Sequence, residues 1–112
     1  MDKNVAYERF YWISEEITRI LKKMQLVEGE EYVLLKRQED CLRRQSSIVR
    51  ASLYRIAINH AIAVAANANE PVFLIDTGTW DDPDYAAVLE SDYDGLDAIH
   101  VLRYVTPDSI AV

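Results

Sequence analysis

The fold is decided between residues 61 and 75, where the sequence is AIAVAANANEPVFLI. The end of this stretch, Val72-Phe73-Leu74-Ile75, is the clearest strand in the chain, because branched and aromatic residues follow one another there. Residues 67–71 contain two asparagines and a proline, which predict a turn. Residues 61–66 fit either a strand or a helix. The turn and strand that follow them favour a strand, whereas their alanines favour a helix. We expect a strand, so that residues 61–66 and 72–75 form a β-hairpin.

The segment before this hairpin predicts a helix over about residues 48–60, with Ser46 and Ser47 as the N-terminal cap. Its apolar residues occupy two sides, one through Val49 and Leu53 and another through Tyr54 and Ile58. A helix that is apolar on two sides is covered on two sides. Either another helix and a sheet enclose it, or a second copy of the chain does.

An amphipathic helix is predicted at the N-terminus, over residues 7–27. Phe10, Ile13, Ile17, Ile20 and Met24 recur at three- and four-residue spacing, and Gly29 follows as a terminator. Residues 32–37, with the sequence YVLLKR, predict a short strand, and the polar residues 38–45 predict a loop.

The C-terminal part predicts acidic loops around a short helical turn and a last strand. The loops span residues 76–84 and 91–97, the helical turn residues 84–91 and the strand residues 99–105. Together these elements predict a single α+β domain over residues 1–112. It has an N-terminal amphipathic helix, a strand–helix–hairpin core and a C-terminal strand, and its small antiparallel sheet is covered by helices.

Charge is distributed unevenly along the 112 residues, whose net charge is −7. Residues 61–112 contain ten acidic side chains and a single basic one, Arg103. An acidic chain is a poor candidate for non-specific nucleic-acid binding, which depends on neutralising phosphates. Cys41 is the only cysteine, so no internal disulfide forms. Neither a signal peptide nor a membrane span is apparent, and we expect a cytoplasmic protein without membrane contact.

The acidic loops with their aromatic residues form the predicted partner-binding surface. Carboxylates attract a basic protein surface, and Trp80 and Tyr93 are suited to anchor it. The residues assigned to this surface are Asp76, Trp80, Asp81, Asp82, Asp84, Glu90, Asp92, Tyr93, Asp94 and Asp97. Trp12, Tyr54 and Ile58 are further interface candidates, and the two-sided helix predicts a homodimer. This hypothesis describes a non-catalytic binding protein.

Arginines near the predicted strand–helix junction support an alternative, a phosphate-ligand site for a nucleotide or nucleic acid. Arg37, Arg43, Arg44, Arg50 and Arg55 could converge on a phosphate beside the helix N-terminus at Ser47. In the competing interpretation, these arginines form ion pairs with acidic residues of the same chain.

A third alternative is an aspartic-type hydrolase centred on Asp76. The segment Leu74-Ile75-Asp76-Thr77-Gly78-Thr79 resembles the strand–Asp-Thr-Gly motif of retroviral-type aspartic proteases, which share a proton between two carboxylates in a dimer. Only 34 residues follow Gly78, fewer than that fold requires, and a turn after a strand explains the same residues. No metal or cofactor site is predicted, because no cysteine or histidine residues lie at ligand spacing.

Residues 47–64, with the sequence SIVRASLYRIAINHAIAV, resemble the core of small phage-encoded accessory proteins. In those proteins a helix of the form Ser-Leu-Tyr-x-x-Ala follows a strand and precedes a hairpin, and residues 52–57 match that form. The resemblance implies a compact, acidic protein that binds host or defence components. Proteins of this kind, including many anti-CRISPR proteins, can occupy the nucleic-acid sites of their targets.

Overall fold

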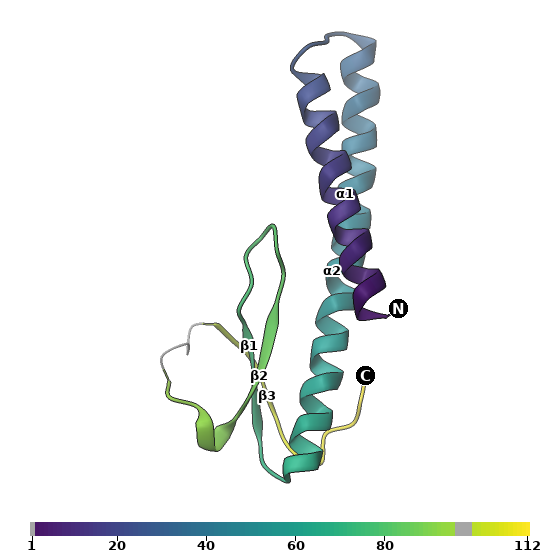
Figure 1. Cartoon of the computed structure of the whole chain (residues 1–112). Coiled ribbons are helices and arrows are strands. Elements are labelled where there is room, and N and C mark those ends of the chain that lie inside the picture. The colour runs from purple at the N-terminus through teal and green to yellow at the C-terminus, as the bar shows by residue number, and fades with distance from the viewer. Residues whose placement is uncertain (1, 96–99) are drawn as a thin grey trace. The chain divides into compact units, whose positions relative to one another are not determined.

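The computed structural model describes residues 2–95 and 100–112 and has an α+β fold (Figure 1). Its helices are α1 (Lys3–Met24) and α2 (Glu30–Ala68). A 3₁₀ turn, η1 (Glu90–Asp92), accompanies the strands β1 (Val72–Asp76), β2 (Tyr85–Leu89) and β3 (Val101–Val105). The chain divides into two compact units, Met1–Ser52 and Leu53–Val112, and α2 contributes residues to both. The predicted fold class, α+β with a small antiparallel sheet, is confirmed.

The first unit is a helical hairpin made by α1 and the first part of α2. The amphipathic helix predicted at residues 7–27 is confirmed, but it ends earlier, at Met24. It also begins earlier because the Asp2 side chain caps it, accepting a hydrogen bond from the Asn4 N–H at 2.9 Å. The buried residues of α1 recur at intervals of three, four and seven residues, as in a coiled-coil seam: Ala6, Phe10, Ile13, Ile20 and Met24. Gly29, at φ +67°, turns the chain into α2.

The length of α2 corrects several predictions at once. The strand predicted at 32–37, the loop at 38–45 and the helix start at Ser46 and Ser47 are wrong, because all of these residues lie inside α2. Residues 38–45 are mostly good helix formers, and ion pairs between neighbouring turns, such as Arg43 with Glu39, stabilise the helix. Ser47 caps nothing, and its hydroxyl donates to the carbonyl of Arg43 at 3.2 Å.

The predicted hairpin of residues 61–66 with 72–75 is also wrong, because residues 61–66 continue α2. The helix ends at Ala68, and Asn69 takes the left-handed conformation at φ 52°. The N–H of Asn69 then donates to the Ala66 carbonyl at 3.4 Å, and that of Glu70 to the Ala65 carbonyl at 3.2 Å. This is the Schellman arrangement, with asparagine in the place where glycine is usual. The helix preference of the alanines therefore prevails over the hairpin.

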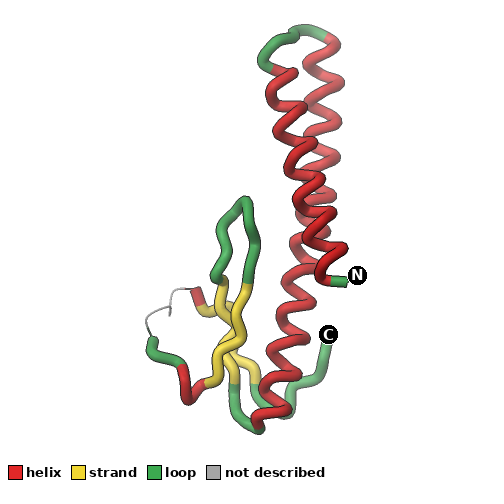
Figure 2. Tube along the Cα trace, viewed as in Figure 1, coloured by secondary structure: helices red, strands yellow, loops and turns green. Residues whose placement is uncertain are grey.

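The second unit packs the last part of α2 against a three-stranded antiparallel sheet with the order β2-β1-β3 (Figure 2). Its core consists of Ile58, Ala61 and Ala65 from α2 with Val72, Leu74 and Val105 from the strands. The strand predicted at 72–75 is confirmed, and the last strand is confirmed over Val101–Val105, as β3. His100 lies outside β3, and residue 99 lies outside the described residues. The helical turn predicted at 84–91 is wrong over residues 85–89, which form β2.

Pairing with β1 explains why residues 85–89 become a strand. Tyr85, Ala87 and Leu89 alternate along β2, lie opposite Asp76, Leu74 and Val72 of β1, and pack against the core of the second unit. This period-two pattern is short and rich in alanine, so it is hard to distinguish from a helical turn in the sequence.

Candidate functional site

The loop between β1 and β2 contains the first group of predicted partner-binding residues. It is bounded by the pair Asp76 and Tyr85, and it presents Trp80, which is 75% exposed. The Asp76 carboxylate accepts the N–H of Gly78 at 3.0 Å, and the Asp84 carboxylate accepts the N–H of Tyr85 at 3.0 Å. These bonds engage carboxylate oxygens with the backbone of the loop itself.

Further backbone bonds give the loop a defined form. The N–H of Thr77 donates to the Asp84 carbonyl at 3.1 Å, and the N–H of Thr79 donates to the Asp82 carbonyl at 3.0 Å. Gly78 lies so close to the backbone of residues 82–84 that a Cβ on Gly78 would be 2.2 Å from the Asp84 nitrogen. The loop is therefore a compact structure whose carboxylates and Trp80 face solvent.

The second group of predicted acidic residues lies at the other end of the sheet. Glu90 and Asp92 belong to η1, which follows Leu89, and Leu89 pairs with Val72 at the opposite end of β1 from Asp76 (Figure 1). The four steps from Tyr85 to Leu89 span about 13 Å along β2. The predicted acidic surface is thus divided between two ends of the sheet. Asp94 follows η1, and Asp97 lies outside the described residues.

An aromatic cluster holds the second acidic segment against the sheet. The ring of Phe73 lies 4.3 Å from that of Tyr93 and 5.1 Å from that of Tyr104, centroid to centroid. The Tyr104 hydroxyl donates to the Glu90 carboxylate, and this hydrogen bond raises the pKa of Tyr104. Tyr93, predicted as a partner anchor, is therefore in contact with the strands of its own chain.

Glu70 fixes the start of η1 from the end of α2. Its carboxylate accepts hydrogen bonds from Ser91, including one from the N–H at 2.6 Å, and these bonds lower the pKa of Glu70. Neither Glu70 nor the Phe73 cluster was identified from the sequence. The alternation of Phe73 with the core residues Val72 and Leu74 is the signal that places it on the other face of the sheet.

The arginines of the alternative phosphate site do not gather around a helix N-terminus. Arg37, Arg43, Arg44 and Arg50 lie within α2, and the helix between Arg37 and Arg50 is about 20 Å long. Arg43 donates to Glu39 at 2.5 Å. Arg50 lies over the ring of Phe10, with its guanidinium 5.0 Å from the ring centroid. Arg55 is also helical and belongs to the second unit.

The remaining interface candidates occupy different environments. Trp12 of α1 is 56% exposed, whereas Ile58 is 5% exposed and lies in the core of the second unit. Tyr54 is half-buried, and its ring lies 5.9 Å from that of Tyr85. The side of α2 that contains Tyr54 and Ile58 is thus covered by the chain's own sheet.

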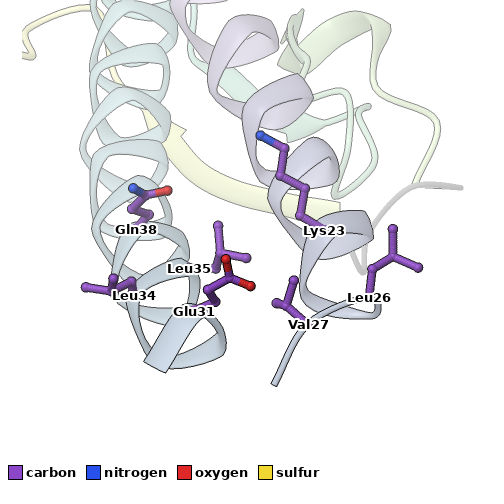
Figure 3. A pocket seen from close by; sticks show the side chains of 7 residues that line it. All are labelled: Lys23, Leu26, Val27, Glu31, Leu34, Leu35 and Gln38. Carbon is purple, nitrogen blue, oxygen red and sulfur yellow. The ribbon is translucent and has the colours of Figure 1, made fainter. Parts of the chain in front are cut away.

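Two apolar grooves lie between α1 and α2 in the helical hairpin. The Leu26 groove, near the turn of the hairpin, has a volume of about 390 Å³ (Figure 3) and is lined by Lys23, Leu26, Val27, Glu31, Leu34, Leu35 and Gln38. The Trp12 groove has a volume of about 300 Å³ and is lined by Arg9, Trp12, Ile13, Gln45, Ile48 and Val49. The sequence did not predict either groove, because their formation requires that residues 30–52 be helical.

Metal and membrane sites find no support in the described part of the chain. Across residues 2–95 and 100–112, no three His, Cys, Asp or Glu side chains gather as a metal ion would require. None of the helices formed by these residues is both long and apolar enough to cross a membrane. Comparisons of the chain with protein-family models, with curated proteins and with solved structures gave no match.

Proposed function

We propose that this chain is a non-catalytic binding protein whose β1–β2 loop contacts a basic surface on a partner protein. One observation carries the proposal: Trp80 is 75% exposed beside Asp81 and Asp82, in a loop that its own hydrogen bonds hold in one form. A fixed loop loses little conformational entropy on binding, which favours affinity.

Charge and aromatic area have separate roles in this contact. The loop carboxylates accelerate the encounter with a basic surface, and this attraction weakens as salt screens it. Trp80 supplies the large, rigid contact area that is typical of residues with dominant binding energy. The acidic residues of η1 lie beyond the other end of β2, which is about 13 Å long, so the loop can bind without them.

The sequence of residues 52–57 still resembles the helix of small phage-encoded accessory proteins, although no strand precedes that helix here and residues 61–66 continue it. This remaining resemblance suggests the class of partner. We take the partner to be a host or defence protein with a basic, nucleic-acid-binding surface, which the acidic loop covers. In this proposal, the chain inhibits its partner by preventing nucleic acid from binding to that surface.

A labelled nona-arginine peptide is a simple probe of the loop, and fluorescence anisotropy measures its binding. We expect the double variant Asp81→Asn with Asp82→Asn to weaken binding of the peptide at least tenfold at low salt. The separate variant Trp80→Ala should weaken binding more than the double variant does at higher salt, where the carboxylates are screened. The matched control is Asp92→Asn with Asp94→Asn, which removes the same charge at the other end of the sheet.

The control separates a local site from general attraction. Equal weakening by both double variants would show that the peptide senses only net charge, and it would refute the assignment to the loop. Binding that does not change between low and high salt would contradict the role of the carboxylates. Capture from a host lysate by the wild-type chain, compared with the loop variant, then identifies the natural partner.

A further inference from the structure

The two grooves of the helical hairpin are related by a regular spacing. Trp12 and Leu26 are fourteen residues apart, and so are Leu34 and Ile48, their counterparts on the α2 side. Fourteen residues make two heptads, so Leu34 and Ile48 lie on the same side of α2. Trp12 lies in α1, and Leu26 lies in the turn two residues after Met24, the last residue of α1. Both grooves therefore open on one face of the hairpin, which we call the groove face.

The groove face has a midpoint that lies equally far from both grooves. Arg19 lies seven residues from both Trp12 and Leu26, and Cys41 lies seven residues from both Leu34 and Ile48. A rotation of 180° about an axis through this midpoint, perpendicular to the helices, exchanges one groove with the other. A second copy that meets this face in the antiparallel direction places Trp12 of each copy opposite Leu26 of the other, as in an isologous interface.

We infer that two copies of the chain associate through their groove faces in an antiparallel four-helix arrangement. Trp12 of one copy enters the Leu26 groove of the other, and Ile48 of one copy packs near Leu34 of the other. An open groove of about 390 Å³ has room for an indole ring. This inference is independent of the proposed function of the β1–β2 loop.

Exposed apolar area supports a second copy as the occupant. Trp12 is 56% exposed, Ile48 66% and Leu34 57%, although these residues lie next to a helical seam, and Leu26, in the turn after α1, is 85% exposed. The face is about 33 Å long and about 20 Å wide, which amounts to about 650 Å² per copy. Two copies bury about 1,300 Å², within the range of specific interfaces.

The polar residues near the midpoint are compatible with the antiparallel direction. The Arg19 side chains of the two copies meet near the axis, where each is paired with Glu16 of its own chain and lies within one turn of Glu16 of the other copy. Near the midpoint of α2, Gln38 faces Gln45 of the second copy.

Sedimentation equilibrium of the full chain tests the association. We expect a dimer whose dissociation constant rises about thirtyfold or more in Trp12→Ala, the effect of removing a dominant interface residue. Ile48→Glu provides a second test, and circular dichroism of both variants checks that the helices persist. Leu21→Ala is the matched control, because Leu21 is an exposed apolar residue of α1 that lines neither groove. A monomer at all concentrations, or a dimer insensitive to Trp12→Ala, would overturn the inference.

Cys41 reports on the direction of association. It is exposed and lies at the midpoint of the groove face, so the two Cys41 thiols of an antiparallel dimer are neighbours across the axis. A short bifunctional maleimide should join the two thiols. The yield of cross-linked dimer should not fall when the protein is diluted, as long as its concentration stays above the dissociation constant of the dimer. Ile48→Glu should abolish the cross-linked product. A dimer without this cross-link would refute the antiparallel arrangement.

Discussion

Replacing Glu39 by glutamine tests how the helical hairpin accommodates a carboxylate in its seam. Glu39 is 3% exposed, although it is charged. Arg43 Nε donates to its Oε1 at 2.5 Å, and Lys36 Nζ donates to its Oε2 at 3.1 Å. The hydrogen bond from Arg43 is the main reason why the pKa of Glu39 is lowered.

The magnitude follows from the two bonds and from the exposure of their donors. A hydrogen bond to a charged group contributes about 1.5–3 kcal/mol. The Lys36 and Arg43 side chains are about half exposed, so water competes with both bonds. Glutamine keeps one acceptor oxygen but loses the charge. We therefore expect Glu39→Gln to lower the free energy of unfolding by about 1–2 kcal/mol at pH 7.

The effect should depend on pH with a defined sign. Because the pKa of Glu39 is lower in the folded chain than its ordinary value of 4.5, its stabilisation is present above that value. The stabilisation is lost as the pH falls through the lowered pKa. Urea unfolding at pH 7 and at pH 3 or below measures both conditions, and the difference between wild type and Glu39→Gln should shrink at the lower pH.

Asp40→Asn is the control for this experiment. Asp40 also pairs with Lys36, at 3.4 Å, but its side chain is 48% exposed. We expect that variant to change the free energy of unfolding by about 0.5 kcal/mol or less. If Glu39→Gln were as stable as the wild type at pH 7, or if the loss did not depend on pH, the assigned role of the carboxylate would be refuted.

Three further predictions concern the second unit. Gly78→Ala should cost about 1–3 kcal/mol, because the added Cβ would lie 2.2 Å from the Asp84 nitrogen, and thermal unfolding measures the loss. Leu74→Ala should lower the free energy of unfolding in urea by about 2–5 kcal/mol, because Leu74 is 1% exposed in the core. The pKa of Tyr104 should fall towards that of an ordinary tyrosine in Glu90→Gln, and NMR titration of ring-labelled tyrosine measures that shift.

The predictable parts of the fold are those where one pattern acts alone. The seam of α1 has a helical period, and Val72-Phe73-Leu74-Ile75 is a short run of branched and aromatic residues after a turn, so the sequence predicts both elements correctly. Residues 32–37 contain branched and aromatic residues that also suit a strand. Their helical state depends on packing against α1 and on the neighbouring turns of α2, which no short window of sequence contains.

The candidate site was predictable in composition but not in arrangement. The acidic and aromatic residues of 76–94 were identified, but their division between two ends of the sheet depends on β2, which was predicted as a helical turn. The arginines were grouped because a loop and a helix start were expected near Ser47. Because residues 37–55 form one continuous helix, each residue lies about 1.5 Å further along the axis than the one before it. The arginines are therefore distributed along the helix and do not converge.

The two proposed interactions should respond differently to ionic strength. The carboxylates of Asp76 and Asp84 accept backbone N–H groups, which neutralise no charge, so the loop keeps its negative field for an encounter with a basic partner. Salt screens that field within about 8 Å at physiological strength. The groove face instead brings together Trp12, Leu26, Leu34 and Ile48, whose burial does not depend on screening. Raising the salt concentration should therefore release a basic partner while leaving the dimer intact, so one titration separates the two surfaces without any substitution.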